Sequence, residues 1–397
     1  MKKFLFLFCF LLLLGLFGVY YAYVALDGGS SVFNPSSDSS DNKDFKPKKM
    51  QTIVLTATGD CLMHNTQILS GKQADGSYNF DFFFREVEDL INEGDYTSVC
   101  FESPVAGSDA GYTGYPLFNS PDEIIYTFKK SGYDLIVTAN NHIMDRGYKG
   151  ALRTMEVIEK AGLDFVGTYK SREDSEKFLI KDIKGVKVGY IAYSYSTNGI
   201  PVPEEHAYFF NYIEEDKILS DIEKLRPKVD VLILVLHWGV EYSTKPTEEQ
   251  RIMARKFLEK GADVILGSHP HVIQPMEVIN IDGRDKVIFY SMGNFISHQR
   301  GIERNSGIVV KLKFTKDMEK GVTVLDEVSY TPTFSHSYYV DGKIQFRVVP
   351  VQKTIENIMT GKEPYLDKSY VPILESVLNQ TTSILGPPFY RDKKNHI

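Results

Sequence analysis

The stretch "DVLILVLHWGVEYSTKPTEEQRIMARKFLEKGADVILGSHPH", Asp230 to His271, decides the fold of this chain. It holds two short runs of Val, Ile and Leu, separated by a longer amphipathic segment at residues 247–260. The same alternation begins at Gln51 and continues to about Asn294. Because the apolar runs are nearly continuous, helices or a second sheet are expected to cover both faces of their sheet. The pattern predicts an α/β layered fold.

Strands and helices are expected to alternate along most of the chain. The expected strands lie at residues 52–60, 97–102, 134–142, 187–194, 230–239, 263–271 and 286–295. The expected helices between them lie at residues 80–93, 121–131, 148–161, 214–225 and 247–260. Three later segments have the pattern of antiparallel strands, at residues 307–314, 322–332 and 343–351. They are expected to extend the sheet or to pack as a second one, and one more helix is expected near residues 371–378.

The composition fits a large folded protein. With 397 residues, of which 43% are hydrophobic, the chain can bury one big core or two ordinary ones. Its net charge of -7 comes from interspersed acidic and basic residues, without the dense Lys/Arg and aromatic stretch of a nucleic-acid groove. No nucleic acid is therefore expected as a partner. With only 3 cysteines, the chain cannot form a disulfide framework. The absence of a CxxC pair argues against a structural zinc site.

The first 26 residues predict an N-terminal transmembrane helix that anchors the chain. Lys2 and Lys3 precede an apolar run that reaches about Leu26, long enough to cross a bilayer. A cleaved signal peptide is the alternative, but the run is longer than a signal core and ends among tyrosines instead of small residues. The positive end favours a single pass in the cell membrane with the domain on the extracytoplasmic side. Residues 27–50, rich in Ser, Asp, Gly, Pro and Lys, are expected to form a flexible linker.

Polar side chains collect where the apolar strands end. Those able to bind a cation or move a proton are Asp60, Glu102, Asn140, Asn141, His142, His237, His269, His271 and Asn294. The carboxyl ends of strands in an α/β sheet converge on one crevice, where ligands bind. A mixed set of carboxylates, amides and imidazoles suits one or two divalent ions of Zn, Mn or Fe. His269 and His271 can address the same centre, because alternate residues of an extended segment point the same way.

Six motifs resemble, in order and spacing, the CapA family of poly-gamma-glutamate capsule synthesis, whose domain is related to calcineurin-like metallophosphoesterases. They are ATGDCLMH (57–64), FESPV (101–105), TANNHIMDRG (138–147), HWGVEY (237–242), GSHPHVIQ (267–274) and YSMGNF (290–295). The resemblance covers about residues 51–350 and leaves residues 351–397 as a C-terminal extension. It implies a four-layer α/β/β/α sandwich of the metallo-dependent phosphatase type, with a metal site at the strand ends.

The resemblance also implies roles for single residues. The implied metal ligands are Asp60, Glu102, Asn141, His237, His269 and His271. Asn141 and His142 match the family's catalytic asparagine-histidine pair, in which the amide binds metal and the imidazole acts as an acid or as a donor to the transition state. This reading competes with a plain N-cap and turn, which Asn and Asp readily form at a helix start.

Two departures from the superfamily pattern bear on the chemistry. Leu62 stands where these phosphoesterases carry a histidine, and Glu102 stands where they carry the bridging aspartate. Further side chains are therefore candidates for ligands or for groups that orient ligands: His64, Asn140, Asp145, Glu241 and Asn294. Cys61 and Cys100 are interpreted as buried free thiols, with a disulfide outside the cytoplasm as the alternative. The histidines outside the motifs are expected on the surface or in loops; they include His206, His336 and His396.

The leading functional hypothesis is a membrane-anchored, extracytoplasmic protein that supports synthesis, export or attachment of poly-gamma-glutamate or a related envelope polymer. Its expected partners are the anionic polymer or its precursor and a membrane complex for polymer synthesis or export. The expected chemistry is that of a metal-dependent hydrolase. Two alternatives remain open: a metallophosphoesterase for a lipid-linked or nucleotide phosphate, and a non-catalytic subunit for polymer binding or export.

Overall fold

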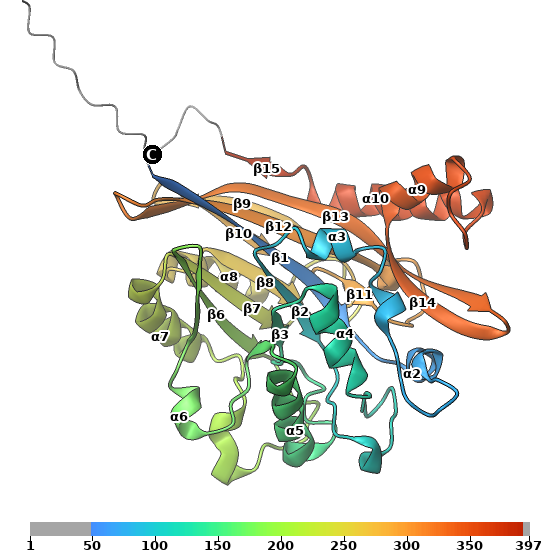
Figure 1. Cartoon of the computed structure of the whole chain (residues 1–397). Coiled ribbons are helices and arrows are strands. Elements are labelled where there is room, and N and C mark those ends of the chain that lie inside the picture. Colours follow the sequence, from blue (N-terminus) through green and yellow to red (C-terminus); the bar gives the residue numbers. More distant parts are fainter. Residues whose placement is uncertain (1–48, 392–397) are drawn as a thin grey trace, which may run out of the picture. The chain divides into compact units, whose positions relative to one another are not determined.

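The structure is a computed structural model that describes residues 49–391, which belong to one compact unit (Figure 1). The anchor expected at residues 1–26, nearly all of the linker expected at residues 27–50, and His396 lie outside the described residues. Within residues 49–391, no helix combines the length and the apolar character needed to cross a bilayer. The transmembrane helix thus stays a prediction from the sequence.

One of the two sheets has nine strands, and its middle is parallel. The order along the sheet is β14-β13-β12-β1-β2-β3-β4, with β11 paired to β1 and β15 paired to β13. The strands β1 to β4 run parallel to one another, whereas β12, β13 and β14 form an antiparallel wing. The bounds are β1 Met50–Cys61, β2 Tyr96–Phe101, β3 Leu135–Val137, β4 Asp164–Val166, β11 Asn294–Ile296, β12 Ser306–Asp317, β13 Val322–Val340, β14 Lys343–Pro350 and β15 Phe389–Tyr390.

The other sheet has six strands in the order β5-β6-β7-β8-β10-β9. Its four central strands are parallel and its two edge strands are antiparallel. The bounds are β5 Leu179–Ile183, β6 Val186–Ser194, β7 Val231–His237, β8 Val264–Ser268, β9 Met276–Ile281 and β10 Arg284–Phe289. The stretch from Asp230 to His271 thus forms the unit β7-α8-β8 at the centre of this sheet, as its pattern predicts.

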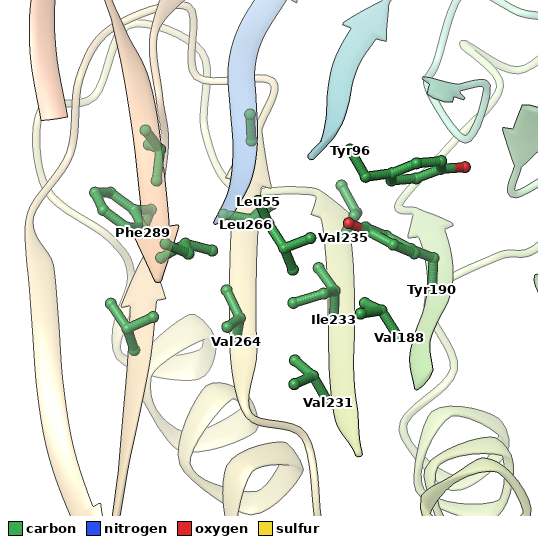
Figure 2. Close-up of a cluster of buried hydrophobic side chains, with 14 of the residues drawn as sticks. Leu55, Tyr96, Val188, Tyr190, Val231, Ile233, Val235, Val264, Leu266 and Phe289 are labelled. Atoms are coloured by element: carbon green, nitrogen blue, oxygen red, sulfur yellow. The ribbon is translucent and has the colours of Figure 1, made fainter. Parts of the chain in front are cut away.

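The two sheets pack against each other through a shared apolar core. Leu55 of the first sheet lies in one cluster with Val188, Ile233, Val264 and Phe289 of the second (Figure 2). Full burial of a side chain of this kind contributes about 1.5–3 kcal/mol. Because both faces of the parallel strands are buried, the nearly continuous apolar runs seen in the sequence are explained.

Helices cover the outer face of each sheet. On the nine-stranded sheet, apolar side chains of α4 and α5 pack against β2 and β3; on the other sheet, those of α7 and α8 pack against β6, β7 and β8. The layers therefore follow the order helix, sheet, sheet, helix, and the predicted α/β fold is confirmed. The helices are α2 Asn65–Gly71, α3 Glu88–Ile91, α4 Glu123–Ser131, α5 Gly147–Lys160, α6 Arg172–Ser175, α7 Glu215–Leu225, α8 Glu248–Lys260, α9 Val351–Met359 and α10 Val371–Leu385.

The prediction of a single helix at residues 80–93 is wrong. The segment folds as a 3-10 turn, Asp81–Phe83, followed by the short helix α3. Phe80, Phe83 and Phe84 are all fully buried and pack in one cluster with the outer helices. Phe82, which a regular helix would place on the opposite face, also packs against this cluster, so packing favours the broken backbone.

His336 is buried within strand β13, so its expected place on the surface or in a loop is wrong. Its Nδ1 accepts a hydrogen bond from Nε of Arg347 at 3.1 Å, and Arg347 also pairs with Glu86 and Glu363. Burial, together with the charge of Arg347, lowers the pKa of His336 to about 3. Since Glu363 follows α9, this network ties the C-terminal segment to β13 and β14. Periodicity cannot reveal it, because its members lie far apart in the sequence.

Candidate metal centre

The carboxyl ends of strands from both sheets meet at one buried site. Asp60 lies at the end of β1 and Glu102 directly after β2, both in the nine-stranded sheet. His237 ends β7 and His269 directly follows β8, both in the six-stranded sheet. All four side chains are at most 2% exposed. The structure thus brings together polar residues that the sequence places at separate strand ends.

Asp60 connects the two sheets. One carboxylate oxygen, Oδ2, accepts a hydrogen bond from the backbone N–H of His269 at 3.0 Å and lies 3.6 Å from Nδ1 of His271. The other oxygen, Oδ1, is buried and accepts no hydrogen bond from the described residues. A buried carboxylate oxygen without a donor is costly unless a cation or water satisfies it.

Glu102 lies between two imidazoles. Its Oε1 is 3.2 Å from Nε2 of His237, and its Oε2 is 3.8 Å from Nδ1 of His271. Within residues 49–391, neither oxygen accepts a hydrogen bond of good geometry. Although burial opposes ionisation, the charges of His271 and His237 hold the pKa of Glu102 well below its usual range. Glu102 is therefore an ionised, buried carboxylate with both oxygens free to bind a cation.

The histidines at the end of β8 differ in protonation. Burial lowers the pKa of His271, but the carboxylates of Glu102 and Asp60 outweigh burial and raise it to about 9. Burial and the neighbouring His237 lower the pKa of His269 to about 2. Near neutral pH, His269 is thus a neutral candidate ligand, whereas a cation held by His271 would have to displace its proton.

His269 and His271 converge by a route that differs from the predicted one. The segment is not extended: His269 has φ +94° and His271 has φ +58°, on either side of Pro270. The two rings lie 5.8 Å apart. Left-handed backbone is unfavourable for residues with a side chain and is typical of functional sites held by their surroundings. The tight turn, and not the alternation of a strand, directs both imidazoles to the centre.

Asn141 and His237 point at one another across the centre. Oδ1 of Asn141 lies 2.8 Å from Nε2 of His237, while Nδ1 of His237 lies 2.9 Å from Oγ of Ser268. Ser268 therefore orients the imidazole from behind, as groups around metal ligands commonly do. Nδ2 of Asn141 donates to Asn198 at 3.1 Å, which holds the amide oxygen toward the centre.

Cys100 lies beneath His237, with Sγ 3.9 Å from Nδ1 of that ring and 3.6 Å from Oγ of Ser268. Burial, with the charges of Asp60 and Glu102, raises the pKa of its thiol well above the usual value. Cys61 and Cys100 are both buried and free, so the interpretation as free thiols is confirmed and the disulfide is not formed. Sequence reasoning missed the contact of Cys100 with the site. The signal is its spacing, since residues two apart along a strand share a face.

The buried side chains fit one or two divalent cations. Two groups each offer ligand atoms within 4.8 Å of one another: Asp60, Cys100 and His237, and Glu102, His269 and His271. These side chains include four buried atoms that have no hydrogen-bond partner among the described residues: Oδ1 of Asp60, Oε1 and Oε2 of Glu102, and Nδ1 of His269. Carboxylate oxygens and imidazole nitrogens left unsatisfied together are the donor set that Zn, Mn or Fe prefers.

His142 lies beside the centre without joining the candidate ligands. Its Nδ1 is 2.8 Å from Oδ2 of Asp145, and the ring packs edge-on against Phe118 at 4.7 Å. Burial lowers its pKa, but the hydrogen bond to Asp145 and the charges of Glu102 and Asp145 together outweigh burial, so the pKa is raised. Asn140 forms the turn beneath it: its Oδ1 accepts from the His142 N–H, and its Nδ2 donates to the carbonyl of Phe101. Asn140 and Asp145 are thus positioning groups.

The remaining candidates fall into different places. Asn294 contacts the site, with Oδ1 3.0 Å from Nδ1 of His271. His64 instead contacts Gln67 at 3.2 Å and the backbone N–H of His298 at 3.3 Å, and burial lowers its pKa to about 4. Glu241 is exposed in the turn after β7 and hydrogen-bonds to no candidate ligand in residues 49–391. Its expected role in orienting an imidazole is not supported, because the turn directs it to solvent.

Comparison with known proteins identifies the family. Residues 54–299 match the bacterial capsule synthesis proteins called PGA_cap. The chain belongs to this family. The matched PGA_cap region contains every candidate ligand from Asp60 to His271, and also Asn294.

Two relatives of this PGA_cap chain come from Bacillus species. The "Capsule biosynthesis protein CapA" of Bacillus anthracis is 28% identical over 71% of this chain and 68% of that protein. The "PGA biosynthesis protein CapA" of Bacillus subtilis is 30% identical over 68% of this chain and 71% of that protein. Among solved structures, a phosphatase of Mycoplasma pneumoniae is 14% identical, covers 71% of this chain and 94% of its own, and has a TM-score of 0.43.

Proposed function

We propose that this PGA_cap protein supports synthesis, export or attachment of poly-gamma-glutamate or a related anionic envelope polymer through a metal-dependent hydrolase site. The observation that carries the proposal is the buried centre of Asp60, Glu102 and His269, with four atoms lacking partners. The polymer class rests on the relatives, two of which are named for capsule or PGA biosynthesis.

The side chains divide into those that hold cations and one that moves a proton. The cations would be held by Asp60, Glu102, Asn141, His237, His269 and His271. Bound divalent ions supply polarisation of a carbonyl or phosphoryl oxygen and lower the pKa of a water molecule. His142 holds a proton with the help of Asp145, at a place where it can donate to a leaving group or to a developing oxyanion. The low exposure of the ligands keeps bulk water from the reacting atoms.

Turnover assays on the purified full chain test this proposal most directly. We expect cleavage of a gamma-linked glutamate polymer in the presence of Mn, Zn or Fe. Chelation should abolish cleavage, because the carboxylates and imidazoles would act on the substrate only through their cations. The assay compares this polymer with phosphodiesters and phosphomonoesters under each metal. Cleavage of a phosphoester alone would favour the metallophosphoesterase alternative. No turnover on any of them would favour a polymer-binding subunit.

The non-catalytic alternative has one specific observation in its favour. Leu62, buried and apolar, occupies the place where the phosphoesterase superfamily has a histidine ligand. His64, the nearest histidine, is held by Gln67 and by the backbone of His298. The centre therefore has one imidazole fewer on the Asp60 side than those enzymes, and a binding or export role would tolerate that loss.

We place the domain on the extracytoplasmic side of the cell membrane, anchored by residues 1–26. Lys2 and Lys3 before a long apolar run support this placement. A membrane complex for polymer synthesis or export is the partner that fits this location. Protease added to intact protoplasts is expected to remove the domain, since the linker predicted at residues 27–50 would be a site of cleavage. Full protection, or a soluble mature form that starts near Asp27, would contradict the anchor.

A further inference from the structure

Arg304 lies at the rim of the metal centre and forms no ion pair with an acidic residue among residues 49–391. It belongs to a 3-10 turn, Glu303–Asn305, just before β12. Its guanidinium carbon is 3.7 Å from the centre of the Tyr242 ring, a close cation-π contact. In the part of the chain that the structure describes, no carboxylate lies within ion-pair distance of this guanidinium. A stacked guanidinium keeps the N–H groups at its edge available for a ligand.

Tyr242 fixes the aromatic side of this contact against the metal centre. Its backbone N–H donates to the carbonyl of Pro270 at 2.7 Å, between the two histidines of the turn. Its ring lies 6.1 Å from the ring of His271, and its backbone has φ +65°. A tyrosine held in left-handed backbone at a site is the kind of strain that surrounding structure maintains for function.

Arg304 is fixed from the opposite side. Its carbonyl accepts a hydrogen bond from Nδ2 of Asn294 at 2.7 Å and one from Oγ of Ser297 at 3.4 Å. Asn294 also contacts His271 through its Oδ1 at 3.0 Å. Asn294 thus fixes the backbone of Arg304, whereas Tyr242, whose ring lies near His271, holds the guanidinium.

We propose that Arg304 binds an anionic group of the substrate beside the metal centre, on the His271 side. The inference rests on the proposed function and names the chemistry that selects its substrate. A guanidinium forms two parallel hydrogen bonds with a carboxylate or with a phosphate. The cations at the centre would take the oxygen at the reacting group, and Arg304 would take a second anionic group of the same molecule. Each residue of a gamma-linked glutamate polymer carries such a carboxylate.

The surrounding charges agree with this role. Glu241 is the acidic residue next to Tyr242. Burial and the charge of Glu241 raise the pKa of Tyr242, whereas the charge of Arg304 lowers it. Glu241 is exposed and forms no ion pair with Arg304 within residues 49–391. Among the described residues, the guanidinium is therefore left without an ion-pair partner that would compete with a ligand. Its neighbour in the same loop, Arg300, is exposed and stacks on no ring in the described residues, which makes it a matched control.

Calorimetric titration of the metal-loaded full chain tests the proposal with two probes, a gamma-linked glutamate oligomer and inorganic phosphate. Arg304→Gln is expected to weaken binding of the oligomer by about 10- to 100-fold, the usual effect of losing hydrogen bonds to a charged group. Arg300→Gln removes the same charge from the same loop and should leave the affinity within about twofold. Arg304→Lys should fall between, because lysine keeps the charge but lacks the planar fork. Metal content, measured by elemental analysis, should be the same in all variants.

The outcomes separate this inference from the proposed function. If the oligomer binds the parent and Arg304→Gln equally well, Arg304 is not an anion site, whereas the polymer function stands. If phosphate alone binds the parent and Arg304→Gln weakens it, Arg304 is an anion site but the proposed polymer is wrong. If neither probe binds the parent, or if Arg300→Gln weakens binding as much as Arg304→Gln, the inference is overturned.

Discussion

Replacement of both His269 and His271 by alanine is expected to empty at least one metal position of the centre. The two imidazoles lie in one group with Glu102, whose oxygens have no other hydrogen-bond partner in the described residues. Loss of two neutral nitrogen donors leaves mainly carboxylates, which bind Zn, Mn or Fe less well. Elemental analysis of the purified protein should show at least one metal ion fewer per chain. Turnover should then fall to background.

The matched control replaces two histidines outside the ligand set, His206 and His298. His206 stacks on Tyr148 at 3.8 Å, and His298 is exposed and bonded to Thr66. Their alanine variant should keep its full metal content. Thermal unfolding gives a second readout, because a cation that binds only the folded state raises the melting temperature. The rise on adding metal should be large in the control and small in the His269/His271 variant. Unchanged metal stoichiometry in the latter would rule out the assignment.

His142→Ala is expected to lower turnover by about 10²- to 10⁴-fold while metal content stays unchanged. The imidazole belongs to neither candidate ligand group, and its polar contacts are to Asp145 and Asn198. It therefore acts on the reaction through its proton and not through the cations. Folding should be nearly intact, because alanine leaves the turn made by Asn140 in place. Polymer production in cells should fall as far as in cells that lack the gene.

Asp145→Asn gives a readout that a structural role would not move. The hydrogen bond that His142 donates to the Asp145 carboxylate raises the pKa of His142, so the asparagine variant should have a lower His142 pKa. A general acid must be protonated, and activity declines as the pH rises above its pKa. The decline at high pH should therefore shift to lower pH in Asp145→Asn.

Normal polymer yield from a stable, metal-loaded His142→Ala protein would leave only the binding or export role.

The alternation of strands and helices could be predicted because each element carries its own period and its own apolar residues. The helix expected at residues 247–260 is observed at Glu248–Lys260, where Thr247 accepts a hydrogen bond from the Gln250 N–H as an N-cap. The helix expected at residues 80–93 could not be predicted in the same way. Its aromatic side chains meet partners from distant helices, and packing with them overrides the local preference.

The sequence by itself determined which polar residues end the strands. It also predicted that they gather, because parallel strands of one sheet end at one edge. Only the tertiary structure decided which of them meet. It brings Asp60 to His269 and Glu102 to His237 across two sheets, and it directs Glu241 to solvent. It also places Arg304 on Tyr242, and Cys100 and Ser268 behind His237. Such contacts depend on how the two sheets pack, and no local period of the sequence encodes that packing.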